Sequence, residues 1–594
     1  MSGFSANKCG SLRAGDAGET IELFGWVARR RDHGGLIFID IRDRWGSTQV
    51  LFNPTEAAVA HAVAAQLRNE YVIRVKGGVR LRPEGMKNPK LATGDVELLA
   101  SELEIITTSK PPPFPIDDED NVADEKVRLR YRYLDLRRPR MQHILQVRHR
   151  VNKTIRDFCD EREFLEVETP MLMKSTPEGA RDFLVPSRVH PGRFFALPQS
   201  PQTLKQLLMV AGVQRYYQIA RCLRDEDLRA DRQLEFTQLD VETSFCDEED
   251  IFEFTESLMA RIWKTVLDVD LEIPFRRMSI RDSLLKYGSD KPDLRYELEI
   301  ADLGAVLKAT EAQVFRRVLE AGGVVRGLAV PGGSDLTRRE LDELVVLAKG
   351  AGGQGLAWLP GPLDKFLTDA ERAGIREATG AEEGDIVLVA ADRRRRTETV
   401  MGRVRQEVAR RRGLVREGEW KFLWINPTYL FEEDDDGNLT YAHHPFTRPM
   451  EEDLAFVEER PYDVRAHAYD IVCNGYELGG GSLRIYDRDM QERVFGLLGL
   501  PLETVRERFG FLLDAFEYGV PPHGGIAWGI DRVVMMLAGT ENIRDVIAFP
   551  KTQGAQDLML DAPSEVDTTQ LDELGLQLKP RPKDRTTDPG PAEE

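Results

Sequence analysis

The sequence lacks paired cysteines and long apolar runs, and these two absences exclude several classes of protein. Its 594 residues include five cysteines and no CxxC pair, so neither a disulfide framework nor a structural zinc is expected, and the thiols should be reduced and mostly buried. The longest apolar runs, such as "VVMMLA", are far shorter than the ~20 residues that cross a bilayer, and the N-terminus lacks a signal-peptide core. We therefore expect a cytoplasmic protein with no membrane association.

The chain also lacks an excess of basic residues. Asp and Glu number 101 against 81 Lys and Arg, a net charge of −20, which would argue against nucleic-acid binding if the charge were evenly spread. The basic residues are clustered, however, in residues 29–44 and 126–140, so local RNA-binding surfaces stay open. The length and ordinary apolar content predict about three to five globular domains.

The usual nucleotide-binding and zinc-binding motifs are missing as well. The sequence has no GxxxxGK[ST], no HExxH and no GxGxxG that follows a strand and opens a helix, so a phosphate site would have to use arginine side chains. Strand-like segments in residues 194–244 follow one another without the spacing of βαβ units. This favours an antiparallel sheet over a doubly wound parallel one.

Composition and periodicity divide the chain into segments of different character. Residues 20–106 read as three strands, a helix and two strands, the order of an OB-fold β-barrel, which commonly binds single-stranded nucleic acid or oligosaccharide. The predicted class is multidomain α+β. The expected divisions are an OB-fold domain at 1–106, a Pro-rich hinge or linker at 107–140, an α+β domain in two parts at 141–290 and 419–579, an inserted α/β module at 291–418, and a disordered tail at 580–594.

A charged loop in residues 221–234 leads into an alternating strand. Strand parity places Phe236, Gln238, Asp240 and Glu242 on one face, which is therefore polar. Taken alone, such a segment is more often a solvated loop and an exposed strand than a site.

Five ordered motifs carry a resemblance to a known family. Arg224, Asp225 and Glu226 resemble motif 2 of the class II aminoacyl-tRNA synthetases, "EFLEVETPMLMKSTPEGARDF" resembles motif 1 with Pro170, and "GGIAWGIDR" resembles motif 3, ending at Arg532. With "ALPQSPQTLKQLLM" and "NGYELGGGSLRIYD", the chain resembles bacterial-type aspartyl-tRNA synthetases of subclass b over nearly its whole length. In that family the catalytic sheet is antiparallel and an inserted module marks the bacterial members.

The resemblance implies a homodimeric ligase that makes aspartyl-adenylate from ATP and L-aspartate with Mg²⁺ and transfers aspartate to tRNA-Asp, with no DNA partner. Attack of a carboxylate on a polyanionic triphosphate needs charge neutralisation, which arginine forks provide. Two alternatives are a tRNA-independent ligase, such as an ammonia-dependent asparagine synthetase, and a non-catalytic tRNA-binding paralogue. The barrel argues against the first, and the presence of Arg224, Glu477 and Arg532 against the second.

The resemblance assigns the site residues, with Arg224 and Arg532 as the catalytic pair. The implied aspartate contacts are Glu178, Gln202, Lys205, Arg224, Asp240, His443 and Arg484. The implied ATP contacts are Arg224, Asp225, Glu226, Gln233, Glu477, Gly529, Ile530, Asp531 and Arg532. The loop from Lys174 to Arg181 is expected to close over the substrate.

The implied magnesium ligands are Glu477 and, as a second ligand, Asp470. Seven residues apart on an unbroken strand, the two carboxylates would face opposite sides of the sheet, so both can bind only if a bulge or bend intervenes. Gly475 is a plausible position for it.

The resemblance also bears on selectivity for the amino acid. Arg484 and Lys205 would hold the side-chain carboxylate of aspartate and reject the neutral amide of asparagine. Where the family usually has an Asp-Phe-Pro segment, this chain has Pro427, Thr428 and Tyr429, which leaves the local loop conformation open.

In the barrel, alternation in "LIFIDI" predicts Ile37, Ile39 and Ile41 in the core and Phe38 on the outer face, where it would stack on an anticodon base. The implied anticodon contacts are Arg31, Phe38, Gln49, Arg82 and Glu97. His33 stands where many strictly tRNA-Asp-specific members have leucine, and with Gly85 it favours members that also charge tRNA-Asn, although the sequence leaves this choice open.

Overall fold

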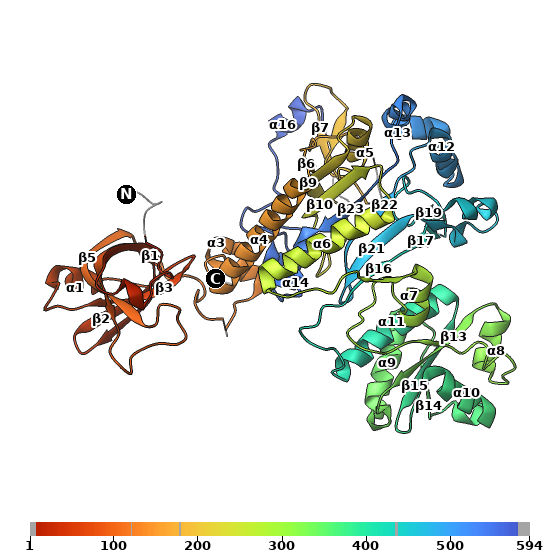
Figure 1. Cartoon of the computed structure of the whole chain (residues 1–594), viewed down its shortest axis with the longest axis horizontal. Coiled ribbons are helices and arrows are strands. Elements are labelled where there is room, and N and C mark those ends of the chain that lie inside the picture. Colours follow the sequence, from red (N-terminus) through yellow and green to blue (C-terminus); the bar gives the residue numbers. More distant parts are fainter. Residues whose placement is uncertain (1–6, 120, 177–179, 434–436, 580–594) are drawn as a thin grey trace. The chain divides into compact units, whose positions relative to one another are not determined.

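The computed structural model of the chain describes residues 7–119, 121–176, 180–433 and 437–579 (Figure 1). It contains two compact units. The first is Met1–Arg150 with Asp227–Leu234 and Val534–Asp567, and the second is Val151–Glu226 with Glu235–Val533 and Thr568–Glu594.

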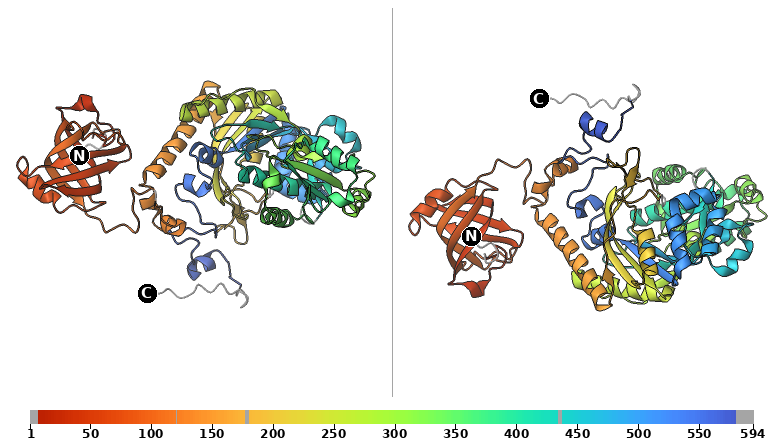
Figure 2. Two further views of the ribbon diagram at one scale, coloured as in Figure 1. Left: turned by 90° about the horizontal axis from the view of Figure 1, so that it is seen from below. Right: turned by 90° about the horizontal axis from the view of Figure 1, so that it is seen from above.

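The first unit begins with a closed five-stranded barrel, whose strands wrap around a common interior in all the ribbon views (Figures 1 and 2). The strand order is β1-β2-β3-β5-β4, and one short helix lies between β3 and β4. This confirms the predicted OB fold. The elements are β1 (Thr20–His33), β2 (Leu36–Asp43), β3 (Gly46–Phe52), α1 (Ala58–Ala64), β4 (Val72–Leu81) and β5 (Val96–Thr107).

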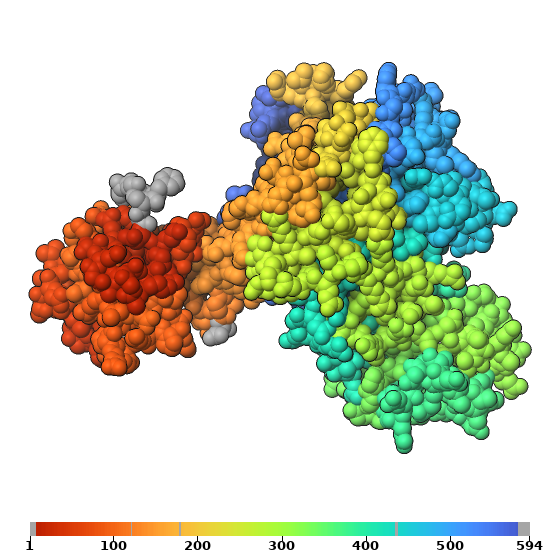
Figure 3. All heavy atoms as spheres, viewed as in Figure 1, coloured from red at the N-terminus to blue at the C-terminus, as the bar shows by residue number. Residues whose placement is uncertain are grey.

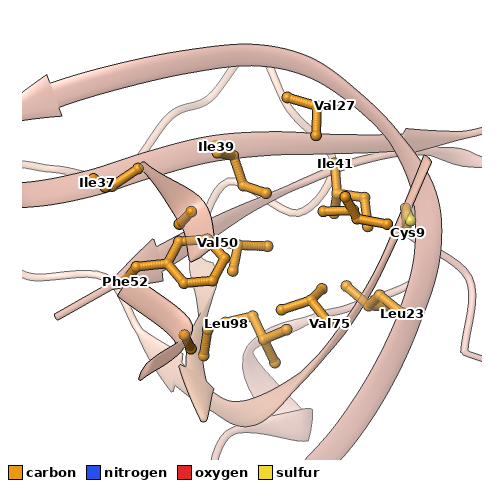
Figure 4. Packing of buried hydrophobic residues seen from close by; sticks show 14 of the residues in the cluster. Cys9, Leu23, Val27, Ile37, Ile39, Ile41, Val50, Phe52, Val75 and Leu98 are labelled. Atoms are coloured by element: carbon orange, nitrogen blue, oxygen red, sulfur yellow. The ribbon is translucent and has the colours of Figure 1, made fainter. Parts of the chain in front are cut away.

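The barrel is filled by the inward side chains of alternating strand residues (Figure 4). Ile37, Ile39 and Ile41 are buried, as predicted, whereas Phe38 between them is only partly buried. Each buried isoleucine contributes roughly 1.5–3 kcal/mol of hydrophobic stabilisation. A one-residue slip of β2 would expose this set, so the core fixes which side chains the outer face presents.

Part of the predicted hinge is helical. It contains α2 (Glu125–Arg130) and α3 (Arg132–Asp135), followed by α4 (Pro139–Glu161). Arg132 is buried, and its guanidinium donates at 2.8–2.9 Å to the carbonyl oxygens of Arg544, Ile547 and Ala548. Asp135 lies 2.6 Å from the same guanidinium. Helical structure therefore begins at Glu125, within the segment assigned to the hinge.

The second unit is built on an eight-stranded sheet. Its order is β11 (Arg276–Met278), β16 (Phe422–Ile425), β21 (Ala468–Cys473), β22 (Tyr476–Leu483), β23 (His523–Gly529), β10 (Glu235–Ser244), β9 (Arg215–Leu223) and β6 (Leu165–Glu166). The six central strands are antiparallel, as expected, but the edge pairs β11·β16 and β6·β9 are parallel. Long connections rather than hairpins join both edge pairs, which permits parallel pairing. The sheet is therefore mixed.

Helix α6 (Glu248–Leu267) covers one face of this sheet (Figure 1). The side chain of Asp247 caps its first turn by accepting from the Asp250 amide. Phe252 on the buried side of the helix packs on Trp424, with ring centroids 4.4 Å apart, and on Tyr469. This aromatic packing fixes the central strands that carry the site.

Residues 291–418 contain a sheet of their own, with the order β12-β13-β15-β14. Buried apolar clusters involve both alternating sets of side chains on β13 and β15. The side chains form a packed body, drawn in green in Figure 3. The elements are β12 (Ala301–Asp302), α8 (Gln313–Glu320), β13 (Val324–Val330), α9 (Arg338–Gly350), β14 (Ala357–Leu359), α10 (Asp369–Thr379), β15 (Ile386–Asp392) and α11 (Arg394–Arg411).

Shorter elements complete the two units. They are β7 (Leu184–Pro186), β8 (Phe194–Ala196), α5 (Gln202–Val210), α7 (Ile280–Tyr287), β17 (Thr428–Tyr429), β18 (Phe431–Glu433), β19 (Leu439–Tyr441), β20 (Arg465–Ala466), α12 (Arg488–Leu497), α13 (Leu502–Ala515), α14 (Ile530–Leu537), α15 (Ile543–Val546) and α16 (Thr568–Glu573). In the described part of the chain no helix is long and apolar enough to cross a membrane. All five cysteines are free and four are buried, as expected. The predicted tail at 580–594 lies outside the described residues.

Candidate active site and RNA-binding face

Two buried cations and two buried carboxylates form a charge cluster between α5, β10 and the residues after β22. Lys205, Asp240, Glu242 and Arg484 are each at most 1% exposed. Lys205 Nζ lies 3.1 Å from Asp240 Oδ1 and 3.4 Å from Glu242 Oε2. Arg484 donates through Nε and Nη2 to both oxygens of Glu242, at 2.9 and 3.0 Å. Sequence reasoning predicted three of these residues and gave Glu242 no role.

The alternation of β10 explains how the two carboxylates meet the two cations. Asp240 and Glu242 lie on the same face of the strand, as predicted, but this face is buried rather than solvated at these positions. Glu242 pairs across the sheet with Gly525. A Cβ atom at residue 525 would lie 2.2 Å from Glu242 Oε2 and 2.1 Å from the Val241 carbonyl oxygen, so only glycine leaves room for the carboxylate.

One buried oxygen of the cluster, Asp240 Oδ2, has no hydrogen-bond partner among the described residues. On α5, the buried Gln202 Nε2, Thr203 Oγ1 and both side-chain amide atoms of Gln206 have none either. Burial raises the pKa of Asp240, and Lys205 only partly offsets this effect. Burial also raises the pKa of Glu242, but Arg484 and Lys205 outweigh it, so its net pKa lies below the ordinary value. An unpaired buried acceptor and an unpaired buried donor are the groups that a polar ligand would satisfy.

The histidine pair extends the cluster. Arg484 Nη1 donates to His444 Nε2 and to Ser482 Oγ, both at 2.6 Å. Burial, with the Arg484 charge beside it, holds the pKa of His444 well below its usual range, so the ring is neutral and its Nε2 accepts. Sequence reasoning singled out His443 and missed this role of its neighbour, although the adjacent "HH" was the available signal.

His443 lies between the charge cluster and a pair of carboxylates. Its Nε2 is 2.9 Å from Thr428 Oγ1, and its Nδ1 is 3.8 Å from Asp470 Oδ1. Thr428 belongs to the segment Pro427–Tyr429, which departs from the family pattern. That segment therefore contacts His443, one of the implied aspartate-binding residues, directly. Burial lowers the pKa of His443 as well.

The two predicted magnesium ligands share one face of the β21–β22 hairpin. Asp470 pairs with Gly480 and Glu477 with Val472, and the register shifts between these pairs. Leu478 is the extra residue of this bulge, and without it Glu477 would point to the other face. The condition of an intervening bulge is therefore met, but the bulge lies at Leu478. Gly475, the position suggested for it, forms the hairpin turn with Asn474, at φ of 86° and 52°.

The chemistry of this carboxylate pair fits a divalent cation. Burial and the nearby Glu477 carboxylate raise the pKa of Asp470 well above its ordinary value, an effect that a cation between them would reverse. Mg²⁺ typically takes one or two carboxylates and completes its shell with phosphate oxygens and water. No group of three or more His, Cys, Asp or Glu side chains that could hold a metal ion occurs among the residues that the structure describes.

Arg532 lies beside Glu477. It is in the first turn of α14, directly after β23, and its Nη1 donates to the Glu477 carbonyl oxygen at 2.7 Å and lies 4.0 Å from the Glu477 carboxylate. Gly529 and Ile530 form the strand-to-helix junction, where the Asp531 carboxylate accepts from the Thr237 amide at 2.8 Å. The predicted motif 3 residues are thus brought next to a predicted metal ligand.

The motif 2 residues lie at the start of the loop between β9 and β10. The Arg224 guanidinium stands 5.0 Å from the ring centre of Phe236. Asp225 follows, and its carbonyl oxygen accepts from Arg181 Nε at 3.3 Å, which joins this loop to the segment predicted to close over the substrate. Of the predicted residues in that segment, Glu178 lies outside the described residues.

Gln233 belongs to the first unit, where its side chain pairs with the backbone of Lys551. Its Oε1 accepts from the Lys551 amide at 2.9 Å and its Nε2 donates to the carbonyl oxygen at 3.1 Å. In the structure the side-chain amide of Gln233 therefore holds the backbone at Lys551. Glu226, another predicted ATP contact, directly follows Asp225 in the loop between β9 and β10.

The outer face of the barrel carries the five predicted anticodon residues. Arg31 pairs across the strands with Phe38 and donates to Asp40 at 2.9 Å and to Gln49 Oε1 at 3.3 Å. Gln49 Nε2 donates to Glu97 at 2.7 Å, and the buried Arg82 donates from Nε to the Val96 carbonyl oxygen. The partly exposed Phe38 ring thus lies beside a network of side-chain donors and acceptors.

The two residues predicted to set tRNA choice lie at the end of a strand and in a loop of this barrel. His33 ends β1 at an exposed position, and Gly85 has φ of 83°, in the left-handed region that favours glycine. Arg42 of the basic cluster is instead buried against Glu70, 2.8 Å away, and Asp117. It does not contribute to an RNA-binding surface.

The chain matches models of known protein families. A family model described as tRNA synthetases class II (D, K and N) matches residues 124–553, and one described as OB-fold nucleic acid binding domain matches residues 21–106. The aspartate–tRNA(Asp/Asn) ligase of Bacillus subtilis is 50% identical over 584 residues, 97% of this chain and 99% of that protein. The enzyme of the same name from Caldanaerobacter subterraneus is 50% identical over 96% of this chain and 98% of its own, and the aspartate–tRNA ligase of Geobacillus kaustophilus is 51% identical over 96% and 98%.

Solved structures support the fold. An asparaginyl-tRNA synthetase from Pyrococcus horikoshii with bound asparaginyl-adenylate is similar with a TM-score of 0.59 at 19% identity, covering 92% of this chain and 98% of that one. A putative aspartyl-tRNA synthetase from Leishmania major gives 0.56 at 18% identity, over 91% and 92%. The chain belongs to the class II tRNA synthetases and, within that class, to the aspartate–tRNA ligase family.

Proposed function

We propose that this chain activates L-aspartate with ATP and transfers it to the 3′ end of tRNA-Asp and tRNA-Asn. The observation that carries the first step is the buried cluster of Lys205 and Arg484 with Asp240 and Glu242, in which Asp240 Oδ2 has no hydrogen-bond partner among the described residues. The cations suit the side-chain carboxylate of aspartate, and the unpaired Asp240 oxygen suits its ammonium group. Gln202 would donate its free amide hydrogen to the same ligand.

Selectivity against asparagine would follow from the two cations of this pocket, Lys205 and Arg484. Lysine and arginine side chains carry no acceptor, so an asparagine amide would present its N–H groups to donors. A binding site whose polar groups are left unpaired by the wrong substrate commonly discriminates against that substrate by 10⁴-fold or more. Each factor of ten corresponds to about 1.4 kcal/mol. No separate editing site is required for this discrimination.

ATP would lie between the motif 2 arginine and the Glu477–Arg532 pair. Arg224 would bind the α-phosphate and the substrate α-carboxylate, and Arg532 the far end of the triphosphate. The α-carboxylate oxygen attacks the α-phosphorus, and the bond to the pyrophosphate oxygen breaks. Glu477 and Asp470 would hold Mg²⁺, which supplies charge neutralisation to the triphosphate when bound.

Pyrophosphate exchange tests the activation step without tRNA. We expect exchange to depend on aspartate and magnesium, and asparagine to support it at least 10³-fold less well, since the donors of Arg484 and Lys205 would face an amide. Arg532→Lys should reduce the rate because lysine cannot form a two-pronged phosphate contact. Equal exchange with asparagine would contradict the proposed pocket.

The barrel would read the anticodon, with Phe38 as the stacking residue and Arg31, Gln49, Arg82 and Glu97 around it. His33 and Gly85 support acceptance of tRNA-Asn, and two of the relatives above carry (Asp/Asn) in their names. Replacing His33 with leucine should lower charging of tRNA-Asn transcript more than charging of tRNA-Asp. An equal effect on both would argue against a role in tRNA choice.

The segment around motif 1 supports a homodimer. Several large apolar side chains are exposed there in the isolated chain, including Leu165 at 57%, Leu172 at 50% and Val189 at 70%. Such a concentration typically marks a protein interface. Sedimentation should give a dimer of the 67.3 kDa chain, and Leu172→Asp should shift it toward monomer. A monomeric wild-type protein would contradict this assignment.

The cytoplasm is the proposed compartment. Five free cysteines, four of them buried, suit a reducing environment. Activity that persists unchanged in a strong thiol reductant is the expected result, and a loss of activity on reduction would contradict it.

A further inference from the structure

The turn between β2 and β3 presents an exposed tryptophan between two cations. Trp45 is 48% exposed. The Arg44 guanidinium lies 4.2 Å from the centre of its ring and Lys8 Nζ lies 5.0 Å from it. None of these three residues was assigned a role by the resemblance.

This turn is held rigidly by the N-terminal segment of the barrel. The Asp43 carboxylate accepts from the amides of Trp45 at 2.8 Å and Gly46 at 3.1 Å, and its second oxygen accepts from the Cys9 amide at 2.8 Å. A Cβ atom at Gly10 would lie 1.9 Å from the Trp45 carbonyl oxygen, so the two backbone segments are in direct contact. Lys8 is therefore fixed on the same surface as Arg44 rather than trailing from a free end.

The two cations are unusual on this barrel because neither forms an ion pair with a carboxylate within the described part of the chain. Most other exposed cations on the strands are paired: Arg31 with Asp40, Arg74 with Glu22, and Lys76 with Glu102. In a chain with a net charge of −20, unpaired cations beside an exposed aromatic ring favour an external polyanion. Stacking on the ring also holds the guanidinium flat, with its donors free for phosphate oxygens.

We propose that Lys8, Arg44 and Trp45 bind the sugar-phosphate backbone of the tRNA outside the anticodon. The inference rests on the proposed function, since it takes tRNA as the polyanion. Phe38 lies five residues before the end of β2, roughly 16 Å at about 3.3 Å per residue, and Trp45 lies in the turn beyond that end, so the two rings cannot contact the same nucleotide. The contact carries no base information and adds equally to the affinity for tRNA-Asp and tRNA-Asn.

The salt dependence of tRNA binding tests this contact. The Lys8→Ala/Arg44→Ala variant should bind tRNA-Asp transcript more weakly, and the slope of log Kd against log salt should fall by about 1.4–1.8, as expected for two lost phosphate contacts. Between about 50 and 200 mM salt, wild-type affinity should then drop about ten-fold more than that of the variant. Trp45→Phe should keep the wild-type slope, and Trp45→Ala should lose part of it.

A matched control removes the same charges elsewhere on the barrel. The Arg74→Ala/Lys76→Ala variant loses one arginine and one lysine that are already paired with carboxylates, and should keep the wild-type slope. An unchanged slope in Lys8→Ala/Arg44→Ala, or an equal fall in both variants, would overturn the inference. Aspartate-dependent pyrophosphate exchange, which needs no tRNA, should be wild-type in every variant. Its absence from the wild-type protein would instead contradict the proposed function.

Discussion

Replacing Glu242 with glutamine tests whether the buried charge cluster builds the aspartate pocket. Glu242 binds Arg484 through both carboxylate oxygens and also approaches Lys205, and it is fully buried. Removing one partner of a buried pair typically costs about 3–5 kcal/mol. Glutamine keeps one oxygen acceptor for Arg484, so we expect the lower end, about 3 kcal/mol.

The kinetic consequence follows from the position of Arg484. The Glu242 carboxylate fixes the Arg484 guanidinium so that its Nη1 points toward Ser482 and His444. A glutamine at position 242 would present an N–H group to one of the Arg484 donors. If the 3 kcal/mol is lost from transition-state binding, kcat/KM for aspartate in pyrophosphate exchange falls by about 10²-fold, at about 1.4 kcal/mol per factor of ten. KM for ATP should change much less.

A control and a pH profile separate this effect from loss of stability alone. Glu256 is also buried, but it accepts from Trp424 Nε1 and the Phe275 amide, outside the cluster. Glu256→Gln should therefore lower stability and leave kcat/KM for aspartate nearly unchanged. In the folded protein the pKa of Glu242 lies below its ordinary value of 4.5. The contribution of the ionised Glu242 to the free energy of unfolding is therefore complete above pH 4.5 and is lost as the pH falls through the folded pKa. Wild-type kcat/KM in Glu242→Gln would refute this reasoning.

Three further changes give distinct outcomes. Gly525→Ala should cost about 1–3 kcal/mol in thermal or denaturant unfolding and should weaken aspartate activation, because its Cβ would lie 2.2 Å from Glu242 Oε2; wild-type stability would show that the strands adjust freely. Glu477→Gln should raise the Mg²⁺ concentration needed for half-maximal exchange, and an unchanged magnesium titration would remove Glu477 from the metal site. A hydrogen bond to Glu248 raises the pKa of His467 above 6.5, so His467→Ala should lower the melting temperature at pH 5.5 and have little effect at pH 8.5, where the wild-type ring is already neutral. An equal loss at both pH values would contradict this pairing.

Alternation was the most informative feature of the sequence. The period of two in "LIFIDI" predicted the isoleucine core of the barrel and the outward Phe38, and the period of two in β10 placed Asp240 and Glu242 on one face. Parity cannot show whether a polar face meets solvent or other charges, because that depends on residues distant in sequence. The ion pairs of Glu242 with Arg484 and of Asp240 with Lys205 were therefore not derivable from β10 alone.

Other features depended on local geometry that no pattern announces. The bulge at Leu478 puts Glu477 on the face of Asp470, yet leucine is not a typical signal for a bulge, whereas Gly475 attracted the prediction and forms the turn instead. The parallel edge strands β6 and β11 have two and three residues, too few to show a period. Helices α2 and α3 were hidden by the proline-rich segment before them, and the buried Arg132 that anchors α3 uses backbone acceptors more than 400 residues away.

Side-by-side aspartylation of tRNA-Asp and tRNA-Asn transcripts is the most direct test of the proposed function. The assay needs purified chain, aspartate, ATP and magnesium at one fixed salt concentration, since RNA affinity depends steeply on salt. We predict that both transcripts are charged with aspartate. Charging of tRNA-Asp alone would contradict the relaxed specificity attributed to His33 and Gly85, and charging of neither, despite intact pyrophosphate exchange, would contradict the transfer step itself.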